Sequence, residues 1–209
     1  MLRGADCVSV SMGKSVGGGT AEPCLGIQGG DGGREGARVA LEVARLAPAR
    51  VERLALIDTG YAPLAAGEAG EQEKAKRHTL LATARAQGVR AMASEWVKGM
   101  VAPHRLADQP LIESILAMFE RKSADIFERQ LRALIQRPDA TPVLQQIQVP
   151  TLVLCGELDA WSPPAQHQAM ADCMAVPPAL VTVADCGHMA MQEQPEAVAQ
   201  AMRQWLSAH

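Results

Sequence analysis

Residues 152–163 read Leu-Val-Leu-Cys-Gly-Glu-Leu-Asp-Ala-Trp-Ser-Pro, and this stretch decides the fold class. Its apolar run ends at Gly156, a pattern typical of a strand buried on both faces of a parallel sheet. Asp159 lies just beyond the carboxyl end of this strand, on the side of an open parallel sheet where active sites form. The alternative role, capping of the helix that Pro163 begins, suits Ser162 better. We therefore interpret Asp159 as a candidate catalytic acid.

A second motif, at 184–189, reads Ala-Asp-Cys-Gly-His-Met and follows the next predicted strand, over 179–184. Because the carboxyl ends of parallel strands meet at one edge, we expect His188 to lie beside Asp159. A lone histidine is more often structural, but an acid at the neighbouring strand end favours a catalytic pair. In such a pair the carboxylate fixes the imidazole tautomer, and the imidazole accepts the proton of a nucleophile.

The elements outward from these motifs alternate between strands and helices. Such alternation predicts an α/β fold with a parallel sheet flanked by helices, and right-handed crossovers between the strands. A helical stretch over about 69–136, with three to five predicted helices, interrupts the pattern. The other predicted elements are a helix from Ala37 to Pro48, a strand over 51–58, helices over Leu111–Lys122 and Ala124–Gln136 within the helical stretch, and helices beginning at Pro163 and Pro195.

Residues 1–36 differ from the rest of the chain in composition and in apolar pattern. They contain 11 of the 18 glycines and show no apolar periodicity after Val10. Ordering such glycine-rich sequence costs much backbone entropy. We therefore expect an irregular segment over 1–36, disordered or non-native, followed by one domain over 37–209.

Composition narrows the class of function. A net charge of −3 gives no electrostatic reason to expect binding to nucleic acid or to an anionic membrane. No apolar run is long enough to span a bilayer, and the N-terminal residues show no apolar run behind a basic start, so we expect no signal peptide. Its five cysteines form no C-x-x-C pair, which suits a reducing compartment and offers no zinc or redox spacing. We therefore predict a cytoplasmic protein that acts on a small molecule without a cofactor or metal.

From Ala37 to His209 the chain resembles the α/β-hydrolase superfamily after its nucleophile elbow. Residues 36–42 resemble the helix that follows the elbow, and 69–136 resemble the helical cap. Asp159 and His188 stand where that family has its acid and its base, in the family's order. The resemblance implies a partial α/β-hydrolase fold and esterase- or lactonase-like hydrolysis of a small ester or acyl substrate.

The expected nucleophile is not in its usual place. The elbow should read G-x-S-x-G before the helix, but Arg34 occupies the serine position in Gly-Gly-Arg-Glu-Gly over 32–36. A guanidinium cannot act as a nucleophile. Ser11, in Ser-Met-Gly at 11–13, is the other candidate, although no helix is predicted after Gly13 to expose its hydroxyl.

Only 36 residues precede the first predicted helix, whereas the family places several strands there. We interpret the N-terminal part as missing or replaced, as an out-of-frame start would produce. A sheet without these strands would leave one edge and its apolar faces uncovered. We therefore expect weak stability, aggregation, or a homodimer formed through that edge.

Three functional hypotheses remain. The first is a serine hydrolase in which Ser11 is the nucleophile, His188 the base and Asp159 the orienting acid. The second is a truncated, non-catalytic relative, either a remnant or a binding module that uses the cap pocket. The third keeps Asp159 and His188 as a general-base pair that activates water without a nucleophilic serine.

Overall fold

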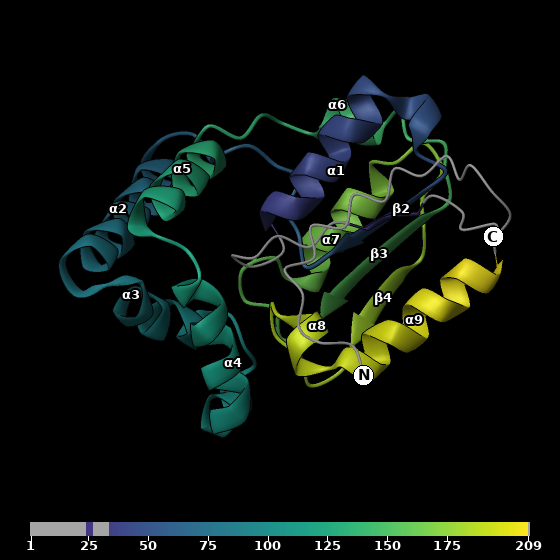
Figure 1. The fold of residues 1–209 in the computed structure, drawn as a ribbon. Helices are drawn as coiled ribbons and strands as arrows, with labels where there is room; N and C mark the ends of the chain where they lie inside the picture. Colours follow the sequence, from purple (N-terminus) through teal and green to yellow (C-terminus); the bar gives the residue numbers. More distant parts are fainter. Residues whose placement is uncertain (1–23, 27–33, 209) are drawn as a thin grey trace, which may run out of the picture.

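One parallel sheet forms the centre of the molecule. The computed structural model describes residues 24–26 and 34–208. Within them, neighbouring strands pair in sequence order and every pairing is parallel, which confirms the predicted α/β class (Figure 1). The strands are β1 (Cys24–Gly26), β2 (Arg53–Ile57), β3 (Thr151–Gly156) and β4 (Leu180–Val183).

The first strand corrects one expectation. β1 lies inside 1–36, where the sequence predicted no regular element, and Leu25 pairs with Leu54 of β2. Three residues are too few to show a period of two, so β1 depends on its partner strand rather than on a local pattern. α1 (Arg34–Leu46) begins three residues before the expected start. Residues 1–23 and 27–33 lie outside the described part of the chain.

Helices cover both faces of the sheet (Figure 1). On one face lie α1, α6 (Thr141–Leu144) and α7 (Pro164–Asp172), and on the other lie α8 (Ala190–Glu193) and α9 (Pro195–Ala208). Successive strand residues point to opposite faces of the sheet, and most strand residues are apolar. Both faces of the sheet are therefore apolar. The buried strand residues on the α1 side are Leu54, Leu56 and Val153, and those on the α9 side are Ala55, Leu152, Leu154 and Val183.

A helical insertion between β2 and β3, here called the cap, stands to one side of the sheet (Figure 1). Two of its helices have side-chain N-caps, because Asp108 accepts the N–H of Leu111 and Ser123 accepts the N–H of Ile126. The predicted helices over 69–136 are thus present, with bounds shifted by a few residues. The cap comprises α2 (Glu68–Gln87), α3 (Val89–Trp96), α4 (Gln109–Glu120) and α5 (Ala124–Ile135), with 3-10 turns Val97–Gly99 and Pro103–Ala107.

The cap has its own apolar core, and this core reaches the sheet domain at Met189. Met189 directly follows His188, so the cap packs on the loop that carries the candidate base. β1 and β4 are the edge strands among the described residues. The homodimer expected through an uncovered edge stays a prediction.

Candidate active site

The structure brings the two predicted site residues together. Asp159 follows β3 and His188 follows β4, and both stand at the carboxyl edge of the sheet. Nδ1 of His188 lies 2.7 Å from Oδ2 of Asp159. Their exposed fractions are 2% for Asp159 and 1% for His188, so this pair is shielded from water. In such a setting a charge-assisted hydrogen bond is strong.

The surroundings of Asp159 keep it ionised. Burial raises the pKa of this carboxyl, but the hydrogen bond and charge of His188 lower it. Oδ1 also accepts the N–H groups of Trp161 and Ser162, both at 2.8 Å, and the net pKa lies below its ordinary value. These contacts form a turn ahead of α7 rather than a helix cap. Because an ionised carboxylate only accepts, the proton on Nδ1 points to Asp159.

A buried acid, Glu193, holds the loop that carries His188. Its Oε1 accepts the N–H of Gly187 at 3.0 Å and that of Met189 at 3.2 Å. Its Oε2 accepts the N–H of Ala102, in the cap, at 2.8 Å. One carboxylate therefore ties the histidine loop to the cap. The sequence analysis missed Glu193, because an acid in a short helix has no local pattern that separates it from surface acids.

Gly187, directly before His188, is needed for the space that it leaves rather than for an unusual backbone conformation. Its backbone is not in the left-handed region, which among the described glycines only Gly67 and Gly88 adopt. A Cβ on Gly187 would stand 2.5 Å from the backbone nitrogen of Ala102 and 2.8 Å from the carbonyl oxygen of Met100. The glycine therefore provides space for the cap segment, whose Met100 carbonyl accepts the N–H of His188.

Asp58 is a second acid at the same sheet edge that the sequence analysis did not select. It directly follows β2, has a positive φ of 47° and is 3% exposed. Its carboxylate accepts the N–H of Ala190 at 2.8 Å and that of Gly156 at 3.2 Å. Burial raises the pKa of Asp58 well above its ordinary value, and the charge of Asp159 adds to this effect. An acid at a strand end, the signal that identified Asp159, could have identified Asp58 too.

Two cysteines lie close to the pair but are unsuited to nucleophilic attack. Cys155 and Cys186 are fully buried. Burial raises the pKa of the Cys155 thiol to about 12, and it also raises the pKa of Cys186. Only the thiolate is nucleophilic, and both groups remain thiols at neutral pH.

His167 is buried and has a structural role. Its Nε2 accepts the N–H of Thr59 at 2.9 Å, which joins α7 to the turn after β2. Burial lowers the pKa of His167, so the ring remains neutral and can accept this bond. No group of three or more His, Cys, Asp or Glu side chains within 24–26 and 34–208 is placed to hold a metal ion.

The structure describes the position of only one of the two candidates for the nucleophile position. Ser11 lies outside the described residues. Arg34 is the first residue of α1, the helix that follows β1 in the chain, as expected for the register in which it replaces the serine. Neither observation assigns a nucleophile.

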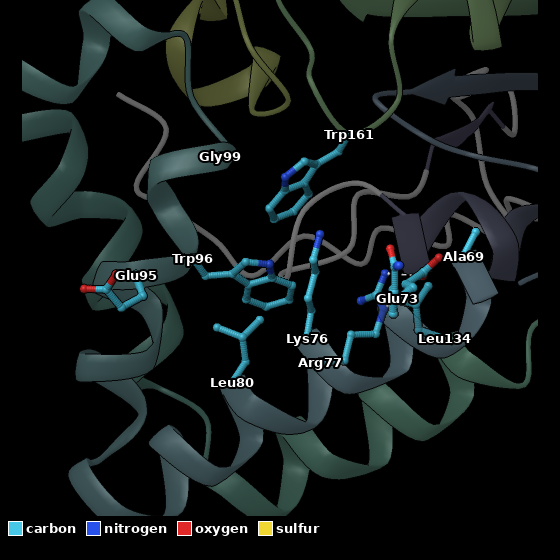
Figure 2. A pocket seen from close by; sticks show the side chains of 11 residues that line it. Ala69, Glu73, Lys76, Arg77, Leu80, Glu95, Trp96, Gly99, Leu134 and Trp161 are labelled. Carbon is cyan, nitrogen blue, oxygen red and sulfur yellow. Dashed lines mark hydrogen bonds and ion pairs between the residues drawn. The ribbon is translucent and has the colours of Figure 1, made fainter. Parts of the chain in front are cut away.

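Trp161, which lies beside the buried pair of Asp159 and His188, lines two cavities. One, of about 530 Å³, lies between α2, α3 and Trp161 (Figure 2). The other, of about 490 Å³, lies between Trp161, α7 and the turn after β2. The indole of Trp161 also stacks at a tilt on the imidazole of His188, with ring centroids 5.0 Å apart. A molecule in either cavity would therefore contact the same side chain as His188. No described helix is both long and apolar enough to cross a membrane.

This sheet, with an acid and a histidine at its carboxyl edge and a helical insertion above them, defines the class of the protein. Residues 32–201 match the model of the alpha/beta hydrolase family, and the chain belongs to that family. Among curated proteins no significant match was found.

Solved structures of the same fold include esterases and a lactonase. A thermophilic esterase from Thermogutta terrifontis is 31% identical, with a TM-score of 0.74 over 84% of this chain and 62% of that one. The enol-lactonase from Burkholderia xenovorans is 22% identical, with a TM-score of 0.68 over 83% and 63%. An esterase from Exiguobacterium antarcticum is 18% identical, with a TM-score of 0.71 over 84% and 65%. The last two show the fold alone, and the chain spans under two thirds of each structure's length.

Proposed function

We propose that this chain hydrolyses a small ester, lactone or similar acyl substrate by a Ser-His-Asp type mechanism. The observation that carries the proposal is the buried 2.7 Å contact between His188 Nδ1 and Asp159 Oδ2. Membership of the α/β-hydrolase family and the likeness to esterase structures support the same reaction class.

In this mechanism Nε2 of His188 accepts the proton of a serine hydroxyl while the serine oxygen attacks the acyl carbon. The carbonyl electrons move to oxygen and return as the alcohol leaves with the proton from His188. Water then attacks the acyl-enzyme, again with His188 as the base, and releases the acid. Asp159 keeps Nδ1 protonated and stabilises the imidazolium. Ser11 is the proposed nucleophile.

The environment of the pair fits this cycle. The backbone N–H groups of Trp161 and Ser162 donate to Asp159 and hold its carboxylate in place. The lowered pKa of Asp159 keeps this carboxylate charged at neutral pH. Glu193 and the carbonyl of Met100 fix the backbone on either side of His188. The imidazole therefore needs little reorganisation when its charge changes, which is the condition for effective proton transfer.

The test is intact-mass spectrometry after treatment of the purified chain with a fluorophosphonate. We expect one adduct, which is absent in Ser11→Ala and strongly reduced in His188→Ala. Ser207→Ala, which removes an exposed serine of α9, is the matched control and should label as the wild type does. An adduct that persists in Ser11→Ala would contradict the choice of nucleophile. Turnover that survives Ser11→Ala without any adduct would favour water activated by His188 alone.

A second candidate function is that of a non-catalytic binding protein with the α/β-hydrolase fold. Arg34 favours it, because this residue begins α1 in the register where the family has its serine. In that case the cap cavities would bind a small molecule without converting it. A folded sample that shows neither an adduct nor turnover of simple esters would support this function over hydrolysis.

A further inference from the structure

The larger cavity is bounded mainly by two cap helices and Trp161, and its lining carries several charged groups (Figure 2). α2 contributes three of these groups and α3 contributes the fourth. The charged lining residues are Glu73, Lys76, Arg77 and Glu95.

Both acids of the lining are neutralised by partners. Glu73 accepts from Arg77 at 2.7 Å and from Arg137 at 2.9 Å, so these three groups together carry a positive charge. Glu95 pairs with Lys98 at 2.7 Å, and Figure 2 shows its carboxylate directed away from the indoles.

Lys76 is the cation that remains available in the cavity. Among the residues that the structure describes, none forms a hydrogen bond or an ion pair with Lys76, whose side chain extends from α2 in the direction of Trp161 (Figure 2). The neighbouring Glu73 carries no surplus negative charge to neutralise it. A cavity with a net positive charge attracts anions and raises their local concentration.

Two indoles connect Lys76 with the catalytic pair. Trp96 and Trp161 lie with their ring centroids 5.5 Å apart and their planes at 31°. Trp161 also contacts the ring of His188. Gly99 allows this arrangement, because a Cβ there would stand 2.8 Å from Nε1 of Trp161. An acyl chain could lie along the indoles with one end at His188 and the other at Lys76.

We propose that this cavity binds an ester or lactone substrate that carries a second, free carboxylate, and that Lys76 is the counter-ion of that carboxylate. The inference rests on the proposed hydrolysis, since it names the substrate class of the same site. Lys76 is a specificity residue in this proposal, because it acts on the end of the substrate remote from the reacting carbonyl.

The first experiment measures binding without chemistry. Levulinate carries a methyl ketone and a carboxylate, and levulinamide is its neutral counterpart, so neither can be hydrolysed as an ester. By isothermal titration calorimetry at low salt, we expect levulinate to bind about tenfold more tightly, because one charge-assisted hydrogen bond is gained. The preference should shrink as salt is added, since the cavity is open to solvent.

Variants of two lysines on α2 assign the preference. Lys76→Met should abolish it, and Lys76→Arg should keep most of it. Lys74→Met is the matched control, because Lys74 pairs with Glu71 and is not part of the cavity lining. Equal binding of the two ligands, binding of neither, or a preference that survives in Lys76→Met would overturn the proposal.

A kinetic comparison separates this inference from the hydrolysis proposal. We expect kcat/KM for monomethyl glutarate to exceed that for dimethyl glutarate, and Lys76→Met to raise KM for the monoester with little change in kcat. Hydrolysis of both esters with equal kcat/KM would overturn the inference and leave the hydrolysis proposal intact. Lys76-dependent binding of levulinate without hydrolysis of any ester would support the carboxylate site and overturn the hydrolysis proposal.

Discussion

The carboxyl edge of the sheet and the cavity of the cap differ in how they hold charged groups. At the sheet edge, Asp159, His188 and Glu193 are almost fully buried. The two carboxylates accept backbone N–H groups, and Asp159 also pairs with His188. In the cap cavity, the charges sit on long side chains of α2 and α3, and Lys76 is exposed.

Under the proposed hydrolysis, this difference separates two tasks. Proton transfer needs groups that are fixed and shielded, because a low-dielectric site strengthens each interaction and leaves little to reorganise. Selection of a substrate needs a charge that can meet a ligand arriving from water, which exposed side chains allow. Changes at the sheet edge should therefore affect kcat and folding, whereas changes in the cap should affect KM and the attachment of the cap.

The largest effect is expected at the sheet edge from Asp159→Asn. The amide would accept from the backbone as before, but it cannot stabilise the imidazolium, so kcat for p-nitrophenyl butyrate should fall about 10⁴-fold with KM almost unchanged. Asp172→Asn, at an exposed acid of α7, is the control and should leave kcat unaltered. A variant that keeps its kcat would show that the pair does not take part in the reaction.

Glu193→Gln tests whether the sheet edge and the cap depend on one buried carboxylate. The glutamine side chain has only one oxygen, so its NH2 group would face the backbone N–H of either Ala102 or Gly187. In both orientations one buried N–H group would lose its acceptor. The free energy of unfolding should fall by about 2 kcal/mol, as measured by urea denaturation. The control Glu196→Gln lies on the exposed side of α9, so it should change stability little. Equal midpoints for the two variants would mean that Glu193 does not anchor the cap.

A smaller effect is expected in the cap from Glu73→Gln. Arg77 and Arg137 each pair with Glu73, and Arg137 also donates to the carbonyl of Ala62, so the variant should loosen one attachment of the cap to the sheet domain. Because Glu73 is partly exposed, we expect a loss of only about 1 kcal/mol. Glu71→Gln, at an exposed acid of the same helix, is the control.

The same acid predicts a pH dependence. Burial raises the pKa of Glu73, but the two arginines outweigh it and lower the pKa from 4.5 to about 2. A carboxyl whose pKa is lower in the folded than in the unfolded chain stabilises the folded state at pH values above its unfolded-state pKa. This contribution is therefore full above pH 4.5 and is lost as the pH falls toward 2. The stability gap between wild type and Glu73→Gln should close over this window. A gap that is constant with pH would contradict the lowered pKa.

The local sequence was sufficient to predict the class of fold and to select both residues of the buried pair, Asp159 and His188. Each strand of 151–156 and 180–183 is a short, mostly apolar run, and the loop that follows each strand carries one residue of the pair. Parallel strands bring their carboxyl ends to one edge, so identifying the strands was enough to predict that Asp159 and His188 meet. The cap helices were predictable because their apolar residues recur at helical spacing.

Contacts between distant segments decided the rest. β1 exists through pairing with β2, since three residues contain no period of their own. Glu193 and Gly187 owe their roles to the backbone of the cap segment around Ala102, which lies some 85 to 91 residues away in the chain. Lys76 and Trp161 share a cavity only because the cap folds back on the loop after β3. The sequence determined the elements other than β1, and the two residues that follow β3 and β4. Only tertiary packing decided which other side chains support or extend the site, because long-range contacts have no local signature.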